Sequence, residues 1–369
     1  MKILHIINSL GPGGAEKLLL NSIPLYNRKG LKVDLLLLKN YNSIFLQELK
    51  SLNICTIYNL NQRSLYNPLI IFRLYKFFKS YDILHVHLFP ALYWSAVAGY
   101  LFGRNKIMIY TEHSTHNKRR DLKYLKLLET IIYKRYNKII CIGNDVKINL
   151  QKWLYHTHDT MYSVIHNGIN LDNFLYAEAF SREILNIPLD AKVLLMVAKF
   201  YIPKDHKTVI EAFANLQNKN VYLIFVGDGV LKKESMDLVK DLHLEDKVLF
   251  LGIRNDIPGL VKMSDICLLS SKWEGFGLVA VEYMAGGKPV VASNVPGLKQ
   301  IVENAGLLFE QGNAIDLKDK IKCLLDDNTI YQDISAKCKE RSFQFGIDKM
   351  VDSYIDIYYK TMDFVIKKS

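Results

Sequence analysis

Two glutamates flank a Gly-Phe-Gly turn in the second half of the chain, with Glu274 before the turn and Glu282 eight residues after Glu274. An ionised carboxylate only accepts hydrogen bonds, and two adjacent hydroxyls can both donate to it. The pair therefore suits the vicinal hydroxyls of a ribose or another sugar. The alternative is an ordinary loop and helix whose glutamates are solvated.

The segment that carries these carboxylates is expected to run from a loop into a helix. The helix should begin near Leu278 and stop at the glycines at 286 and 287, which can adopt the left-handed conformation. The backbone amides of Phe276, Gly277 and Leu278 would point out of its N-terminus, where partial positive charge favours a phosphate. Amides for a diphosphate and carboxylates for hydroxyls together predict a sugar-nucleotide site.

Short apolar runs at 265–270 and 289–292 flank this segment and should position it as buried strands of a parallel sheet. In open parallel sheets, ligands lie beyond the carboxyl ends of the strands. The loops that follow strands are therefore where functional side chains are expected.

Other loops of this kind supply further candidates. Lys199 and Lys204 follow an expected strand at 193–198 and could neutralise a leaving diphosphate, unless they are solvated loop lysines. His113 follows an expected strand at 107–110 and should project into the cleft from the other domain; a structural histidine is the alternative. Gly14 ends a glycine cluster after the first strand, where backbone can approach a phosphate, although a plain glycine turn is the alternative. Arg254 is also expected to contact the bound sugar nucleotide.

Apolar β-branched runs alternate with helical stretches along the whole chain, which predicts βαβ units and an α/β fold of two doubly wound parallel-sheet domains. We place the first domain at 1–168 and the second at 169–347, facing one another across a cleft. The segment 348–366 has helical spacing and is expected to pack back onto the first domain. The expected strands are 3–7, 33–38, 83–86, 107–110, 139–142, 164–166, 193–198, 221–226, 248–251, 266–269, 290–292 and 307–309.

Composition favours a globular protein of the cytoplasm. The chain has 369 residues, half of them apolar, and its five cysteines form no Cys-x-x-Cys pair. Residues 2–8 read as a strand rather than a secretory leader. The longest nearly uncharged stretch, 88–102, is shorter than the roughly 20 residues of a bilayer span and is expected to be a buried helix.

Charge is unevenly distributed between the two halves. Residues 1–170 carry 23 Lys and Arg against 9 Asp and Glu, whereas residues 171–369 carry 25 against 28. The basic half suits an anionic partner such as a membrane surface, a lipid diphosphate or nucleic acid, and a solvated basic face is the alternative.

A run of basic, apolar and aromatic residues at 118–138 could place this basic half on an anionic membrane. Helical spacing separates one set of apolar residues from one set of lysines, as in a helix lying on a membrane surface, although an ordinary half-buried helix has the same pattern. The loop 117–120 adjoins His113 and could instead guide an anionic acceptor. The apolar set is Leu125, Leu128 and Ile132, and the basic set is Lys123, Lys126 and Lys134.

Metal sites are not expected. Two histidine pairs, at 85 and 87 and at 156 and 158, have no cysteine or carboxylate ligands nearby. No Asp-x-Asp pair that could hold a divalent ion occurs in the chain, so no metal ion or other cofactor is expected, and lysines and helix amides would have to offset the charge of a diphosphate.

At these motifs the chain resembles glycosyltransferase family 4, the retaining sugar-nucleotide enzymes of the GT-B fold, whose signature is Glu, seven residues, Glu. The matching stretch is 274–291, and the segments 6–16 and 164–169 are also similar to the family. The resemblance implies that Glu282 holds the ribose, Glu274 holds donor sugar hydroxyls, and His113 approaches the donor sugar. Lys199 stands where the family usually has Arg, which replaces a bidentate fork with a point charge.

The implied function is a metal-independent transfer of a hexose or related sugar, with retention, from a UDP- or GDP-sugar to an acceptor. A lipid-linked saccharide in surface polysaccharide assembly is the expected acceptor, which places the enzyme on the inner face of the membrane. A GT-B sugar-nucleotide epimerase is one alternative and would act on the donor alone. A non-enzymatic nucleic-acid binder is another, but no recognition motif supports it, so no nucleic-acid partner is expected.

Overall fold

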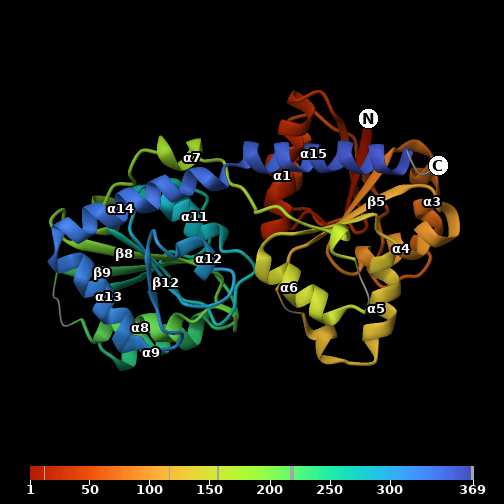
Figure 1. Cartoon of the computed structure of the whole chain (residues 1–369). Coiled ribbons are helices and arrows are strands. Elements are labelled where there is room, and N and C mark those ends of the chain that lie inside the picture. The colour runs from red at the N-terminus through yellow and green to blue at the C-terminus, as the bar shows by residue number, and fades with distance from the viewer. Residues whose placement is uncertain (12, 116, 156–157, 217–219, 367–369) are drawn as a thin grey trace. The chain divides into compact units, whose positions relative to one another are not determined.

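The computed structural model describes residues 1–369 except 12, 116, 156–157, 217–219 and 367–369. The chain divides into two compact units (Figure 1). Unit 1 consists of Met1–Gly168 and Ile347–Ser369, and unit 2 consists of Ile169–Gly346. Each unit is a parallel sheet with helices, which confirms the expected class of two Rossmann-like domains.

Unit 1 contains, within its described residues, a seven-stranded parallel sheet in the order β3-β2-β1-β4-β5-β6-β7. Its strands are short apolar runs, and five of the six residues of β1 are buried, as expected for a sheet covered on both faces. Their bounds are β1 Lys2–Ile7, β2 Lys32–Leu37, β3 Ile57–Asn59, β4 Ile83–His87, β5 Ile107–Glu112, β6 Lys138–Cys141 and β7 Tyr162–Val164.

The helices of unit 1 connect these strands, and the last one comes from the C-terminal end of the chain (Figure 1). They are α1 Gly14–Arg28, α2 Ile44–Ser51, α3 Ile70–Ser80, α4 Ala91–Phe102, α5 Leu125–Lys134, α6 Asn144–Trp153 and α15 Ile347–Ile366. Two short 3₁₀ helices, Lys118–Asp121 and Asp159–Met161, precede α5 and β7.

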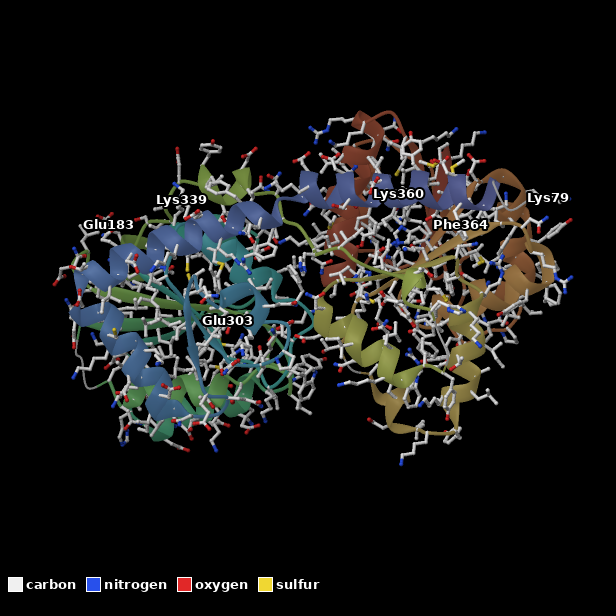
Figure 2. The ribbon with its side chains drawn as sticks, viewed as in Figure 1. Lys79, Glu183, Glu303, Lys339, Lys360 and Phe364 are labelled. Carbon is white, nitrogen blue, oxygen red and sulfur yellow. The ribbon has the colours of Figure 1, made fainter. Side chains whose placement is uncertain are left out.

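Helix α15 packs on α1 and β5 of unit 1. Tyr354 and Tyr358 are buried, and the Tyr358 hydroxyl lies 2.6 Å from Nδ1 of His85 in β4. Lys360 and Phe364 mark the exposed side of the helix (Figure 2). The C-terminal segment is therefore part of the core of unit 1 although it follows unit 2 in the sequence.

Unit 2 contains, among the residues described, a six-stranded parallel sheet in the order β10-β9-β8-β11-β12-β13. The order reverses between β8 and β11, which follow one another in space but not in sequence. The strands are β8 Lys192–Val197, β9 Val221–Val226, β10 Val248–Phe250, β11 Ile266–Leu269, β12 Val290–Ser293 and β13 Leu307–Phe309.

Helices of unit 2 cover this sheet, and its core includes Phe200, Phe225 and Phe309, all nearly inaccessible. The helices are α7 Asp172–Leu175, α8 His206–Ala214, α9 Lys232–Asp241, α10 Ile257–Met263, α11 Leu278–Ala285, α12 Lys299–Val302, α13 Ala314–Asp326 and α14 Asn328–Ser342. The 3₁₀ helices are Glu183–Leu185 and Phe343–Phe345.

Among the residues described, no helix combines the length and the apolar character needed to cross a bilayer. The uncharged stretch at 88–102 contains the whole of α4, whose packed face includes Leu92, Ala96 and Ala98. A helix buried in the protein was the expectation for this stretch.

Candidate active site

The reversal of strand order in unit 2 brings together the loops that follow β8 and β11. Lys204 pairs with Ser271 as an isolated antiparallel bridge. The backbone amide of Asp205 donates to the carbonyl of Ser270 at 3.1 Å, and that of Lys272 donates to the carbonyl of Pro203 at 2.8 Å. Such a switch point is where open α/β sheets bind ligands. Lys204 and Glu274 therefore lie in the two loops that meet at this switch point.

Lys204 and Glu274 form an ion pair at this point, and each side chain is about 20% exposed. The Lys204 ammonium also donates to the Ser271 hydroxyl at 3.2 Å. The pair is largely withdrawn from water, so the hydration that both groups lose offsets much of their attraction, and the pair is weak evidence for stability. The arrangement does fix one cation and one anion side by side, in the loops that follow β8 and β11.

Helix α11 begins at Leu278 and ends at Ala285, as expected. Gly277 caps it in the left-handed conformation with φ of 86°, and Gly287 follows it with φ of 74°. Glu282 lies within the helix and is 5% exposed. The Phe276 ring is buried against Phe345, so only its backbone can serve a ligand.

Two residues that the sequence reasoning missed hold the Glu274 loop in place. The buried Ser293 hydroxyl, at the end of β12, accepts from the Ser271 amide at 2.9 Å and donates to the Ser271 carbonyl at 2.8 Å. A Cβ at Gly297 would lie 2.4 Å from the Glu274 carbonyl oxygen, so only glycine lets the two loops approach. The glycine after the Val-Val-Ala-Ser strand was the available signal.

A second missed pair supports the loop that follows β8. Gly227 and Gly229, after β9, have positive φ, and a Cβ on either would lie within 2.4 Å of the carbonyl oxygen of Ala198 or Phe200. The Phe200 ring also stacks on His206 with centroids 3.9 Å apart. A Gly-x-Gly directly after a strand was the signal for this close approach.

The other expected donor residues of unit 2 occupy separate places. Lys199 is exposed, at the start of the loop after β8. Arg254 follows β10 and pairs with Asp256, with its Nε 2.8 Å from the carboxylate. This pairing raises the pKa of Arg254 and lowers that of Asp256. The Arg254 guanidinium also lies 5.2 Å from the centre of the Phe180 ring.

A groove of about 760 Å³ lies beside the site, between the loop after β8 and α9. It shares Lys204 and Lys272 with the two loops. The described residues that line it do not include Glu274 or Glu282. The groove is therefore a neighbour of the carboxylate pair and not the space into which that pair faces.

In unit 1, Gly14 is the first residue of α1, after β1. A Cβ on the preceding Gly13 would lie 2.2 Å from the carboxylate of Glu16. Glu16 therefore folds back over the N-terminus of the helix, where a carboxylate is stabilised by the helix dipole. A phosphate bound through Gly14 would have to displace it.

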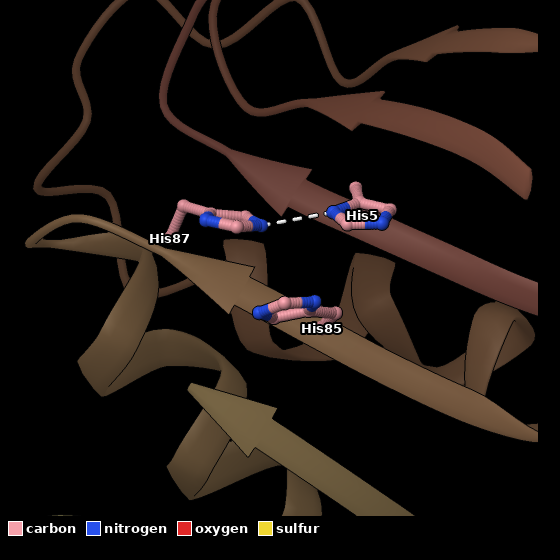
Figure 3. A group of neighbouring side chains, drawn as sticks. All are labelled: His5, His85 and His87. Carbon is pink, nitrogen blue, oxygen red and sulfur yellow. Dashed lines mark hydrogen bonds between the residues drawn. The ribbon is translucent and has the colours of Figure 1, made fainter. Parts of the chain in front are cut away.

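His113 follows β5 and belongs to a chain of imidazoles that the sequence reasoning did not foresee. Its Nε2 lies 3.1 Å from Nδ1 of His87, and Nε2 of His87 lies 2.9 Å from Nδ1 of His5 in β1 (Figure 3 shows the second contact). Burial lowers the pKa of His113 to about 4 and that of His5 to about 3. The three rings are therefore neutral at pH 7.

His85 packs beside this chain and was considered with His87 as a metal pair. Within the described residues, nitrogens of His5, His85 and His87 form one cluster that lies within 4.8 Å. The nitrogens of His85, however, lie 2.6 Å from the Tyr358 hydroxyl and 2.7 Å from the Thr111 hydroxyl. The geometry is that of hydrogen-bonded rings. The other histidine pair includes His156, which lies outside the described residues.

Two arginines of the basic run are built into the protein. Arg119 pairs with the fully buried carboxylate of Glu129 at 2.7 Å and covers the Phe89 ring. Arg120 pairs with the buried Glu112 at 2.8 Å and its side chain is only 7% exposed. The expectation that the loop 117–120 guides an anionic acceptor therefore does not extend to these two guanidinium groups, because buried carboxylates already neutralise them.

The structure shows α5 as a half-buried helix. Ile132 is buried as expected, but Leu128 is exposed together with Leu127 and Ile131. Lys134 and Lys123 are exposed as well. One face of α5 thus packs on unit 1, and another presents apolar and basic side chains to solvent.

Two family models match the chain. Residues 12–173 match the model described as Glycosyltransferase Family 4, and residues 178–342 match that described as Glycosyl transferases group 1. The Anabaena protein HepE, solved in complex with UDP-glucose, has a TM-score of 0.84 and 23% sequence identity over 98% of this chain and 100% of that chain. This likeness confirms the GT-B fold.

Three curated proteins are similar over most of the chain. The Escherichia coli UDP-Gal:alpha-D-GlcNAc-diphosphoundecaprenol alpha-1,3-galactosyltransferase is 31% identical over 312 residues, 80% of this chain and 79% of that protein. The Bacillus anthracis N-acetyl-alpha-D-glucosaminyl L-malate synthase is 28% identical over 311 residues, 77% and 76% of the two. A Campylobacter jejuni alpha-N-acetylgalactosaminyltransferase for a diphospho-undecaprenol-linked saccharide is 26% identical over 366 residues, 93% and 95% of the two. The chain belongs to glycosyltransferase family 4.

Proposed function

We propose that the protein transfers a sugar, with retention, from a UDP- or GDP-sugar to a lipid-linked saccharide during surface polysaccharide assembly. The observation that carries the proposal is the Lys204–Glu274 pair at the switch point of unit 2, with Glu282 on the helix that follows. This set offers a cation for a diphosphate and two acceptors for hydroxyls.

In this proposal Glu282 accepts from the ribose hydroxyls, Glu274 accepts from hydroxyls of the transferred sugar, and His113 approaches that sugar. Lys199, Lys204 and the first amides of α11, at positions 276–278, face the diphosphate, and Arg254 and Gly14 also contact the donor. The acceptor oxygen bonds to the anomeric carbon while the bond to the phosphate oxygen breaks. The departing phosphate takes the proton of the acceptor hydroxyl on the same face, so no metal ion or cofactor is needed.

The acceptor is inferred from the relatives. The Escherichia coli and Campylobacter jejuni proteins are named for diphosphoundecaprenol-linked acceptors, whereas the Bacillus anthracis protein is named for L-malate. The basic charge of unit 1 favours the lipid diphosphate, because it attracts an anionic partner over a distance. A soluble hydroxy acid is the competing acceptor, and assays with both classes distinguish them.

Replacing Glu282 with alanine should raise the Kd for the donor by about 10- to 100-fold, because hydrogen bonds to a charged group contribute about 1.5–3 kcal/mol. Turnover of the bound complex should change less. Glu274→Ala should lower kcat as well, because Glu274 is proposed to bind the sugar whose bond to the phosphate breaks during the reaction. Titration calorimetry with UDP- and GDP-sugars gives Kd, and anomeric NMR of the product reports retention.

Glu303→Ala is the matched control, because this glutamate lies in the same unit and is about half exposed (Figure 2). Its donor affinity should equal that of the parent. Donor incubated without acceptor should stay unchanged, whereas a new sugar nucleotide in that tube would identify an epimerase. Unaltered kinetics in both Glu274→Ala and Glu282→Ala would refute the site.

We also propose that unit 1 docks on anionic membrane through α5, which presents Leu127 and Ile131 beside lysines. Each lysine near such a surface contributes about 1 kcal/mol, so replacing Lys123, Lys126 and Lys134 with glutamine should weaken vesicle binding by roughly 100-fold. Co-sedimentation with anionic vesicles at low salt measures this. Binding of the parent should fall as salt is raised, because ions screen the attraction.

The control replaces three exposed lysines of unit 1 on other elements, Lys32, Lys50 and Lys79, with glutamine. It has the same net charge as the α5 variant and should sediment like the parent. Equal loss of vesicle binding in both variants would show that net charge, and not the surface of α5, attracts the protein to vesicles. The absence of any binding by the parent would contradict the membrane proposal. Arg119 and Arg120 are left unchanged, because their loss would strand buried carboxylates.

A further inference from the structure

The chain from His113 through His87 to His5 restricts where protons can sit. A neutral imidazole carries one N–H, which is either on Nδ1 or on Nε2. Each contact in the chain needs one donor and one acceptor. Once His113 adopts one tautomer, the tautomers of His87 and His5 therefore follow.

Only two arrangements satisfy both contacts. In the first, His5 donates from Nδ1 to His87, His87 donates from Nδ1 to His113, and the proton of His113 is on Nδ1. In the second, His113 donates from Nε2, His87 donates from Nε2, and the proton of His5 is on Nε2. The two arrangements differ at the ends of the chain, where His113 Nδ1 is a donor in one and an acceptor in the other.

The buried end of the chain favours the first arrangement. Nε2 of His5 is inaccessible and has no hydrogen-bond partner among the described residues. His5 lines a void of about 10 Å³, at the lower limit for one water molecule, together with Ala15, Leu18 and Leu19 and with the hydroxyl-bearing Ser22, Tyr26 and Tyr354. An unpaired buried N–H is rarer in proteins than an unpaired acceptor. The ring nitrogen of His5 is therefore better left without its proton.

The surroundings hold the rings in this alignment. The ring planes of His5 and His87 are nearly parallel, with an interplanar angle of 13°. His85 packs beside both, with centroids 4.7 and 4.3 Å away, and is itself fixed by Tyr358 of α15 and Thr111 of β5 (Figure 3 shows the three histidines). A ring held in this way cannot rotate to exchange its two nitrogens without breaking the chain.

We propose that His87 and His5 are positioning residues that hold His113 as the tautomer protonated on Nδ1, so that it presents a hydrogen-bond donor to the sugar being transferred. The contact of His113 with that sugar rests on the proposed function. The tautomer itself does not, because it follows from contacts within unit 1. A donor at this place selects sugars with a hydroxyl or carbonyl oxygen opposite His113.

The test is nitrogen NMR of the full chain with ¹⁵N-labelled histidine at pH 7.5, with the His113 signals identified by their loss in His113→Gln. The parent should show His113 neutral and protonated on Nδ1. His87→Leu removes the partner of His113 Nε2, so the signals should move towards the tautomer mixture of a free ring. Thr111 contacts His85 but none of His113, His87 and His5, so Thr111→Val should leave the His113 signals unchanged.

Activity gives a second measurement. His87→Leu should lower kcat/KM by about tenfold while the affinity for the nucleoside diphosphate without sugar stays as in the parent. A parent His113 protonated on Nε2, or charged at pH 7.5, would overturn the proposal whatever the activity. If His87→Leu does not fold, His5→Asn replaces it, since an amide can donate or accept and so releases the preference. Unchanged His113 signals in that variant would also overturn the proposal. An Nδ1-protonated His113 in a protein that binds no sugar nucleotide would instead refute the proposed function alone.

Discussion

Replacing Lys204 with alanine is expected to lower kcat/KM by about 10²- to 10³-fold, or about 2.7–4 kcal/mol of transition-state stabilisation. Negative charge grows on the diphosphate as the sugar leaves, and the Lys204 ammonium at the switch point opposes it. Its loss also leaves the Glu274 carboxylate without its cation, which adds repulsion. Steady-state kinetics with donor and acceptor measure the change.

Lys207→Ala is the matched control, because Lys207 lies in the first turn of α8, is 69% exposed and pairs with Glu211. It should change kcat/KM less than twofold. The parent should stay active after exhaustive chelation. Strict dependence on magnesium or manganese would show that a metal ion, and not Lys204, neutralises the leaving diphosphate. A loss below tenfold in Lys204→Ala would place this lysine outside the reaction.

Unit 1 should lose stability as pH falls below about 6.5. Burial lowers the pKa of His5 to about 3 and those of His85 and His87 well below their usual value, so the folded state excludes protons that the unfolded chain binds. Each such ring lowers the free energy of unfolding by up to about 1.4 kcal/mol per pH unit between pH 6.5 and its folded pKa. Burial also lowers the pKa of His113 to about 4, so the four rings together amount to about 5–6 kcal/mol per pH unit.

Urea denaturation at several pH values between 7.5 and 5 measures this dependence. His5→Leu removes one of the four rings and should make the dependence shallower by about a quarter. Leu4→Ala, next to His5 in β1 and fully buried, should lower stability by about 2–5 kcal/mol at every pH and leave the slope unchanged. Identical slopes in the parent and His5→Leu would contradict the linkage.

The sheets could be predicted because uninterrupted apolar runs leave few alternatives to a buried strand. The runs 221–226, 266–269 and 307–309 coincide with β9, β11 and β13. The short strand β3 was missed, and 164–166 was placed two residues late relative to β7. Their sequences, Ile-Tyr-Asn and Tyr-Ser-Val, include polar residues and form no apolar run, unlike the Leu-Leu-Phe of β13.

The candidate site was predictable where chemistry and turn geometry coincide, as at Gly277 and the start of α11. The Lys204–Glu274 pair and the supports at Gly297 and Ser293 depend on contacts between loops far apart in sequence. The histidine chain was beyond reach for the same reason. Its members come from three strands or strand ends, and only the order of the sheet places them side by side.

The chain enters unit 2 after Gly168 and leaves it before Ile347. Ile169 and Gly346 form a parallel bridge, and the amide of Ile169 donates to the carbonyl of Phe345 at 3.0 Å. Unit 2 is thus an insertion whose two ends adjoin. Domains with adjoining ends tolerate circular permutation and transplantation. Residues 169–346 can therefore be expressed as a separate cassette, and unit 1 can be closed by a short linker in their place or can receive the corresponding cassette of another family member.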